Sequence, residues 1–103
     1  MIFIETSTFT KLLPEYLSDD EYLTLQAFLM KVPDAGDVVK GSGGVRKIRW
    51  AIDGKGKRSG IRTIYYWNKP DDEIWMLTIY RKSERSIIPA HILKQIAEAI
   101  DHG

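Results

Sequence analysis

The spacing of apolar residues predicts one strand and two helices in the first third of the chain. The segment Ile2–Glu5 is short and rich in β-prone residues, which predicts a strand. Hydroxyl residues at 6–8 precede apolar residues at helical spacing, so we expect a helix to about Leu17 that Pro14 shortens or kinks. The segment SDDE at 18–21 matches a capping box, and a second helix should follow it to about Val32.

Turn-forming residues between 33 and 44 allow a short strand at 37–39 and then give way to three β-prone segments. These segments are Val45–Ile52, Ile61–Trp67 and Glu73–Tyr80. A glycine-rich loop at 54–60 joins the first two, and the turn NKPDD at 68–72 joins the last two. Pro89 suits the first turn of a closing helix. The apolar face of that helix carries Ile92, Leu93, Ile96 and Ile100.

The predicted order of elements is β-α-α-β-β-β-α. This order implies an α+β fold, with helices packed on one face of a small, mostly antiparallel sheet. The length of 103 residues favours one domain, spanning residues 1–103, and the contents of 44% apolar and 28% charged residues are ordinary for a globular protein.

Composition excludes several functional classes. No apolar run approaches the roughly 20 residues that a membrane span needs, and the segment MIFIETS lacks the features of a secretory signal. The chain has no cysteine and only two histidines, so we expect neither disulfides nor a metal site. We therefore expect a cytoplasmic protein that acts away from membranes and needs no metal or other cofactor.

Positive charge is concentrated between residues 40 and 69. This segment holds nine lysines and arginines against the single acid Asp53, whereas residues 1–39 have a net charge of −5 and residues 70–103 a net charge of −2. The nine bases are Lys40, Arg46, Lys47, Arg49, Lys55, Lys57, Arg58, Arg62 and Lys69. A basic band between acidic flanks favours a polyanionic ligand, most often a nucleic acid.

Alternation along the segment 45–52 separates charged from apolar side chains. Lys47 and Arg49 share one face of this predicted strand, whereas Arg46, Ile48 and Trp50 share the other. The pattern predicts a strand with one cationic face and one core face.

Three more polar residues lie where they can join the cationic face. Arg62 lies early in the next predicted strand, and Tyr80 and Lys82 lie at the end of the last one. If these strands are neighbours in sequence order, the three side chains converge with Lys47 and Arg49 on one face of the sheet.

A cluster of lysine, arginine and tyrosine without histidine suits attack by an RNA 2′-hydroxyl on its own phosphate. The reaction needs a base for the hydroxyl proton, cations near the non-bridging oxygens and an acid for the departing 5′-oxygen. Arginine is well matched to phosphate oxygens, because its planar fork donates hydrogen bonds in pairs. Lysine and tyrosine are poor bases at reference pKa values of about 10.4 and 10. We expect crowded cations to lower the pKa of both.

Three segments between Gly36 and Ser86 form a longer motif: GDVVKGSGGVRKIRWA, GKGKRSGIRTIYYW and LTIYRKSERS. In this order and spacing they resemble the RelE/ParE superfamily of type II toxins, and within it the HigB-type branch. The resemblance implies a RelE-like fold and a metal-independent endoribonuclease that cuts mRNA on the ribosome. It also implies a cognate antitoxin as partner, with promoter DNA bound only by the toxin–antitoxin complex.

The same resemblance assigns roles to five residues. Lys47 and Arg49 match the basic pair that holds mRNA phosphates and supports proton transfer, and Arg62 matches the arginine that stabilises the transition state. Tyr80 and Lys82 match the IYxK ending of the HigB-type branch. RelE has a catalytic tyrosine where residues 87–90 of this chain offer none, so Tyr80 is expected to take its place. The resemblance leaves open which of these side chains accepts the proton.

Other basic residues are interpreted as RNA contacts rather than catalytic groups. Those at 55–58 lie in the glycine-rich loop, where contact with phosphates is the expected role. The full set of predicted RNA contacts is Arg46, Lys55, Lys57, Arg58, Arg81 and Arg85.

Two other functions are compatible with the same fold. One is a ParE-like inhibitor of DNA gyrase, although ParE-like chains generally lack a full set of ribonuclease residues. The other is a non-catalytic module, which would bind RNA in a salt-sensitive manner without cutting it. The basic set favours the endoribonuclease.

Overall fold

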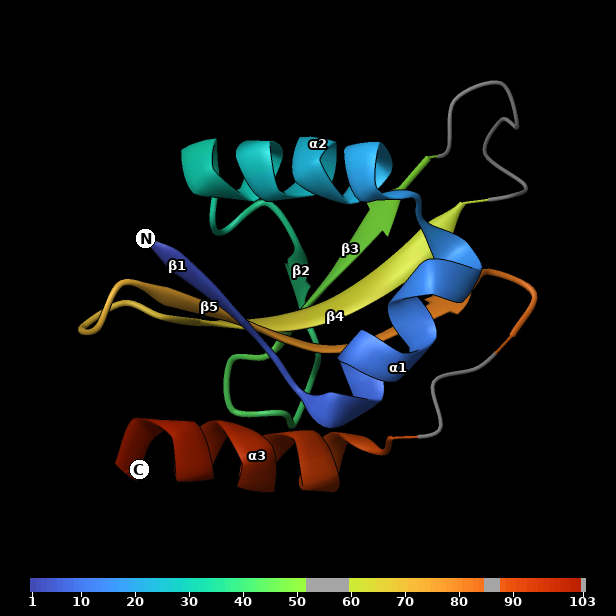
Figure 1. The fold of residues 1–103 in the computed structure, drawn as a ribbon. Helices are drawn as coiled ribbons and strands as arrows, with labels where there is room; N and C mark the ends of the chain where they lie inside the picture. Colours follow the sequence, from blue (N-terminus) through green and yellow to red (C-terminus); the bar gives the residue numbers. More distant parts are fainter. Residues whose placement is uncertain (52–59, 85–87, 103) are drawn as a thin grey trace.

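The computed structural model describes residues 1–51, 60–84 and 88–102. The predicted α+β class and order of elements are confirmed, and the short strand expected near residue 37 is present (Figure 1). Within the described residues, no helix has the length and apolar character to cross a membrane. The elements are β1 (Ile2–Glu5), α1 (Ser7–Tyr16), α2 (Asp19–Lys31), β2 (Asp37–Val38), β3 (Arg46–Trp50), β4 (Ile61–Asn68), β5 (Glu73–Arg81) and α3 (Ala90–His102).

The five strands form one sheet in the order β1-β5-β4-β3-β2. The pairs β2–β3, β3–β4 and β4–β5 are antiparallel, and β1 runs parallel to β5. The prediction of a mostly antiparallel sheet is therefore confirmed. Sequence neighbours from β2 to β5 are also sheet neighbours, which is the condition under which the predicted site residues converge.

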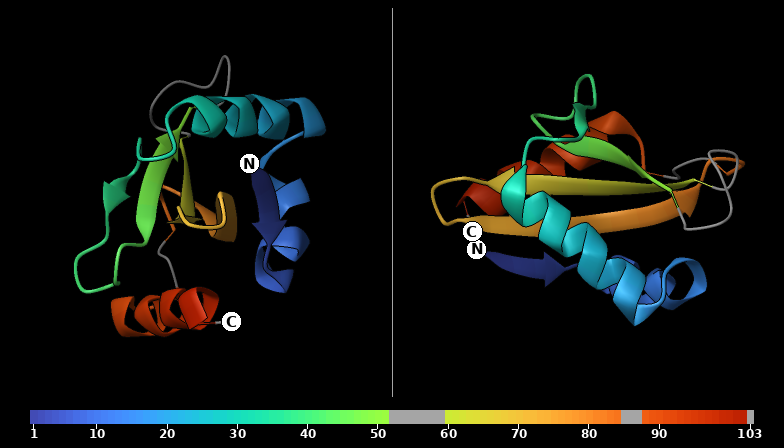
Figure 2. Two further views of the ribbon diagram at one scale, coloured as in Figure 1. Left: turned by 90° about the vertical axis from the view of Figure 1, so that its left-hand side faces the viewer. Right: turned by 90° about the horizontal axis from the view of Figure 1, so that it is seen from above.

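The helices lie on both faces of the sheet, so the prediction that they pack on one face is wrong. Helices α1 and α2 cover one face, where Phe9, Leu25 and Leu29 pack with Ile48 and Tyr65. Helix α3 covers part of the opposite face (Figures 1 and 2). There its buried residues Leu93 and Ala97 pack against Val45, Ile64 and Leu77.

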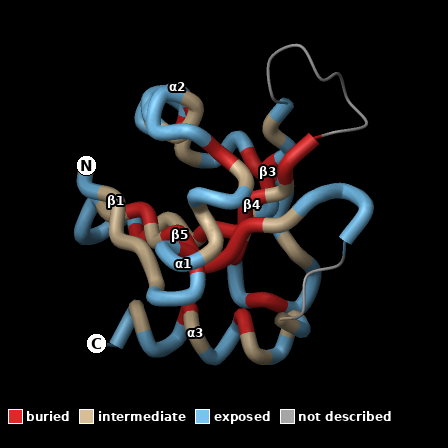
Figure 3. The backbone as a smooth tube through the Cα atoms, turned by 45° about the vertical axis from the view of Figure 1, so that its right-hand side comes forward, coloured by how far each residue is buried: buried red, intermediate tan, exposed pale blue. Residues whose placement is uncertain are grey.

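The physical reason is that both faces of the central strands are apolar. Tyr65 of β4 and Met76 of β5 lie in the core beneath α1 and α2. Their neighbours Ile64 and Leu77 lie in the core beneath α3. A sheet with two apolar faces must be covered on both. Figure 3 shows that the buried backbone is concentrated in these central strands, while much of the helical surface is exposed.

Side-chain caps fix where the first two helices begin. The Thr6 hydroxyl accepts a hydrogen bond from the Phe9 amide at 3.1 Å and donates one to the Leu77 carbonyl at 2.8 Å, which ties the start of α1 to β5. The predicted capping box is present at α2, where Ser18 and Glu21 bond each other's backbone amides at 3.1 and 2.7 Å.

A buried tyrosine holds the chain between α2 and β2. The Tyr65 hydroxyl accepts a hydrogen bond from the Gly36 amide at 2.9 Å and donates one to the Pro33 carbonyl at 2.8 Å. A β-carbon at Gly36 would lie 2.9 Å from the Tyr65 ring, so this close approach requires glycine. Tyr65 therefore sets the point at which the chain enters β2.

Substitution of this tyrosine by phenylalanine, Tyr65→Phe, is expected to lower the free energy of unfolding by about 2 kcal/mol. The change leaves the amide of Gly36 and the carbonyl of Pro33 without their partner in a buried place. Urea unfolding measures the loss. The control is Tyr66→Phe, which removes a hydroxyl bonded at the surface and should cost at most about 0.5 kcal/mol. Equal losses in the two variants would contradict this role of Tyr65.

Candidate active site

A row of three polar side chains crosses the centre of the sheet. In the register of the strands, Arg49 of β3 lies opposite Arg62 of β4, and Arg62 lies opposite Tyr80 of β5. Directly opposed residues have β-carbons about 4.5–5.5 Å apart and project from the same face. The structure therefore brings these three predicted residues together, as the alternation in the sequence suggested.

Two lysines flank this row. Lys47 lies two residues before Arg49 on the same face of β3, opposite Ile64, and its side chain is exposed. At the other end, the Lys82 amide donates a hydrogen bond to the Gly60 carbonyl at 3.1 Å, which continues the β4–β5 register by one residue. Lys82 therefore follows Tyr80 on the same face, and all five residues predicted to be catalytic share one surface.

This surface is the part of the α3-facing side of the sheet that the helix leaves open. The core beneath α3 includes Ile64 and Leu77, and Tyr80 packs at its border. Arg49 is exposed, and Arg62 is half-buried. We call the five residues Lys47, Arg49, Arg62, Tyr80 and Lys82 the cationic row.

The opposition of Arg49 and Arg62 is unfavourable for folding. Like charges directly opposite each other destabilise a sheet, and among the described residues neither arginine forms a salt bridge. The pair therefore does not stabilise the fold, and a bound polyanion would offset its repulsion.

The carbonyl of Gly60 helps to position the row, and sequence reasoning did not single it out. It accepts a hydrogen bond from the Arg62 guanidinium at 3.3 Å as well as the bond from the Lys82 amide. The bond restrains one side of the guanidinium. This role of Gly60 could have been found only from the strand register, which places Gly60 opposite Lys82.

The turn that carries Lys82 is anchored to α1 by two further residues that the sequence did not indicate. A carboxylate oxygen of Glu84 accepts hydrogen bonds from the Arg81 amide at 2.8 Å and from the Tyr16 hydroxyl at 3.0 Å. The Arg81 guanidinium lies 5.4 Å from the centre of the Tyr16 ring, in a cation–π contact. This exposed cluster fixes the backbone immediately after Tyr80.

Tyr80 differs from what the charge pattern suggested. Burial raises the pKa of its phenol above 10.0, and the positive charge of Arg62 offsets only part of the shift. The prediction that crowded cations lower the pKa of this tyrosine is wrong, because half-burial against the α3 core outweighs the nearby charge. At neutral pH the Tyr80 phenol therefore keeps its proton.

Two predicted RNA contacts lie away from the cationic row. Arg46 is on the α2 side of β3, and its guanidinium donates to the carbonyls of Asp34 at 3.2 Å and Gly36 at 2.8 Å. Arg81 is on the side of α1, over Tyr16. Both arginines therefore contact other residues of the protein on the face of the sheet opposite to the cationic row. The remaining predicted contacts, Lys55, Lys57, Arg58 and Arg85, lie outside the described residues.

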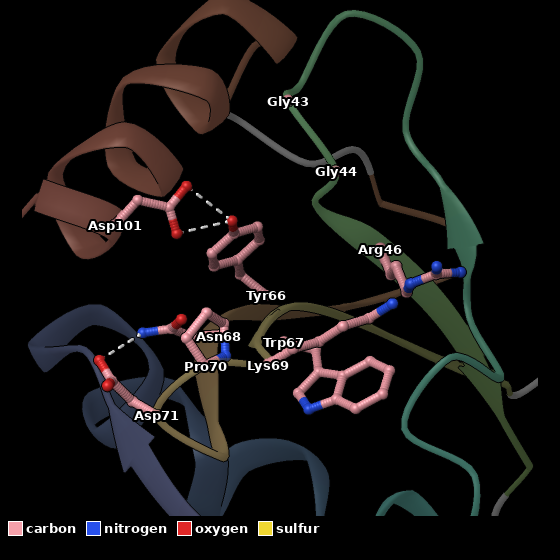
Figure 4. Close-up of a pocket in the computed structure, with 10 residues that line it drawn as sticks. All are labelled: Gly43, Gly44, Arg46, Tyr66, Trp67, Asn68, Lys69, Pro70, Asp71 and Asp101. Carbon is pink, nitrogen blue, oxygen red and sulfur yellow. Dashed lines mark hydrogen bonds between the residues drawn. The ribbon is translucent and has the colours of Figure 1, made fainter.

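A cavity of about 600 Å³ lies at another part of the sheet, near the β4–β5 turn (Figure 4). Its lining combines Arg46 and Lys69 with the acids Asp71 and Asp101 and includes no member of the cationic row. The Tyr66 hydroxyl donates to Asp101 at 2.8 Å, and burial with this carboxylate raises the pKa of Tyr66 to about 12. Mixed charge makes this cavity a poorer site for a polyanion than the open cationic row.

No family model matches the chain. Among solved structures, it resembles the free-state structure of a mutant of the E. coli toxin RelE, with a TM-score of 0.58 and 17% sequence identity over 92% of this chain and 96% of that chain. This chain has the RelE fold. The predicted fold is therefore confirmed, whereas assignment to the HigB-type branch stays a prediction. At this identity the likeness shows the fold alone, and the chemistry of the site depends on the side chains described above.

Substitution of one of the opposed arginines, Arg49→Thr, is expected to leave the free energy of unfolding unchanged or to raise it by about 0.5 kcal/mol. The change removes a like-charge pair from the RelE-fold sheet and introduces a strand-forming residue. Lys47→Thr is the control in the same strand. Because Lys47 lies opposite Asp37, its loss should lower stability by about 0.3 kcal/mol.

Urea unfolding at low and high salt measures both variants. The difference between them should shrink at high salt, since exposed charges are then screened. A greater loss of stability in Arg49→Thr than in Lys47→Thr at low salt would show that the opposed arginines do not repel one another.

Proposed function

We propose that this protein is the toxin of a type II toxin–antitoxin system, an mRNA endoribonuclease of the HigB type that acts on the ribosome. The observation that supports the proposal best is the row Arg49–Arg62–Tyr80, flanked by Lys47 and Lys82 on one open face. The likeness to RelE, a protein named as a toxin, agrees with it.

The two opposed arginines suit the phosphate at which RNA is cut. When the 2′-oxygen bonds to phosphorus and the bond from phosphorus to the 5′-oxygen breaks, negative charge builds on the non-bridging oxygens. Arg62 is restrained through Gly60, and Arg49 lies opposite it, so two cations lie side by side before the substrate arrives. Such prearranged charge stabilises the transition state more than the ground state.

Tyr80 is the proposed acid in this reaction. Its raised pKa keeps the phenol protonated at neutral pH, so it can give its proton to the departing 5′-oxygen. The proton of the attacking 2′-hydroxyl passes to a group on the same face, for which the flanking Lys47 and Lys82 are the candidates. The products are a 2′,3′-cyclic phosphate and a free 5′-hydroxyl.

The ribosome and an antitoxin are the proposed partners. The cationic row is an open sheet face rather than an enclosed cleft, so the site of translation must supply much of the orientation of the mRNA. Orientation of this kind can lower a barrier by several kcal/mol. The antitoxin covers the toxin in the cytoplasm, and promoter DNA is bound only by the complex.

Loss of the central cation, Arg62→Ala, is expected to reduce cleavage of translated messages by about a hundredfold to a thousandfold, as for loss of one prearranged charge. Primer extension after brief induction measures cleavage. The control is Lys11→Ala, which removes an exposed cation from α1 and should cut like the parent protein. If the parent protein and Arg62→Ala both leave translated messages intact, the ribonuclease hypothesis is rejected. Gyrase-linked DNA breaks would then assign a ParE-like function.

Removal of the phenol, Tyr80→Phe, is expected to lower the single-turnover rate by about a hundredfold or more, with little change in RNA binding. Because the pKa of Tyr80 is raised, its acid form persists as pH rises, and the Tyr80-dependent part of the rate should not fall between about pH 7 and about 9. Cleavage on purified ribosomes at several pH values measures both effects. A rate that rises with deprotonation of Tyr80 would make it a base instead.

A further inference from the structure

Strand β3 has an outer edge that the described residues leave partly unpaired. The Val39 amide donates to the Val45 carbonyl at 2.8 Å, and Asp37 lies opposite Lys47. Backbone groups of an antiparallel strand alternate between its two neighbours, so Arg49 is the next residue to turn its amide and carbonyl toward this edge.

The chain does not continue along this edge because it bends away at Gly36 toward Tyr65. Within the described residues, no backbone group pairs with Arg49 on that side. An edge of this kind is a template for pairing with an extended segment of another chain.

A groove of about 320 Å³ follows the same edge. Its floor is β3, and its walls come from Phe28 of α2 and from the bend at residues 35–37. The Phe28 and Trp50 rings pack against each other within it at a tilted angle, with ring centres 5.4 Å apart, and Phe28 is 38% exposed. The groove is thus apolar on the α2 side.

On the other side of the same edge lie exposed cations. Lys47 already faces an acid, Asp37 of β2, but Arg49 faces only another arginine. A segment that continued the line of β2 would place one residue opposite Arg49, with its side chain on the cationic face. The residues on either side of it would turn toward Phe28 and Trp50.

We propose that the β3 edge binds an extended protein segment in which acidic and apolar residues alternate. The acid lies opposite Arg49 and pairs with it, the flanking apolar residues enter the groove at Phe28, and the backbone of the acid exchanges two hydrogen bonds with Arg49. The short strand β2 shows the same pattern, since Asp37 lies opposite Lys47 and Val38 points to the other face.

The identity of this partner as an inhibitor rests on the proposed function. A strand in this place would neutralise Arg49 and block access to Arg62, so an antitoxin that uses it would inactivate the enzyme directly. The unpaired backbone and the apolar groove favour a protein segment over RNA, because RNA offers no strand with which to pair.

A synthetic peptide with blocked ends, in which glutamate alternates with phenylalanine and valine, tests the inference without ribosomes or RNA. Fluorescence anisotropy of the labelled peptide measures binding, and hydrogen exchange reports on the Arg49 amide. We expect slower exchange at Arg49 and a binding affinity about tenfold lower in Phe28→Ala. Methylation of the backbone nitrogen of the central glutamate should weaken binding about fivefold.

The control variant is Leu23→Ala, which removes an exposed apolar side chain from the same helix but outside the groove and should bind like the parent protein. Phe28→Leu serves as a second variant should Phe28→Ala fold poorly, and circular dichroism checks both. Both Phe28 variants should retain RNA cleavage. If the parent protein binds the peptide but does not cut RNA, only the proposed enzymatic function is rejected. Peptide binding that is indifferent to Phe28 and to methylation overturns the inference. The inference is also overturned if Phe28→Ala weakens the binding of single-stranded RNA but not the binding of the peptide.

Discussion

The register of the three central strands is the constraint on which the rest of the structure depends. It sets Arg49 against Arg62 and Arg62 against Tyr80, and it continues through the Gly60 carbonyl to Lys82. A shift by one residue would turn all these side chains to the α2 face. The sheet keeps a like-charge pair at its centre, which costs stability, and in the proposed function this pair holds the phosphate.

The division of helices between the two faces explains why this site stays open. Helices α1 and α2 cover one face, while α3 covers only part of the other and ends its contacts near Tyr80. The border position of Tyr80 raises its pKa, and the same border leaves Arg49 accessible. The bend at Gly36, held by Tyr65, exposes the β3 edge. One packing arrangement therefore sets the partial burial of Tyr80, the exposure of Arg49 and the open edge of β3.

Much of this could be predicted from the sequence, because periodicity and caps act locally. The strands, the capping box at Ser18 and the shared face of Lys47 and Arg49 followed from spacing alone. The position of α3 could not be predicted in this way, because local patterns do not indicate which face of a sheet with two apolar faces a helix covers. The pKa of Tyr80 was mispredicted for the same reason, since burial depends on the packing of distant elements. The roles of Gly60 and Glu84 depend on backbone contacts that residue types do not reveal.

The most direct test of the proposed ribonuclease site uses an mRNA with a single 2′-deoxynucleotide at the position where the message is expected to be cut on the ribosome. The all-ribose message should be cleaved to a 2′,3′-cyclic phosphate and a 5′-hydroxyl, and the deoxy message should remain intact, because the nucleophile is missing. Equal cleavage of the two messages, or a product that carries a 5′-phosphate, would contradict an attack by the 2′-hydroxyl at the row formed by Arg49, Arg62 and Tyr80.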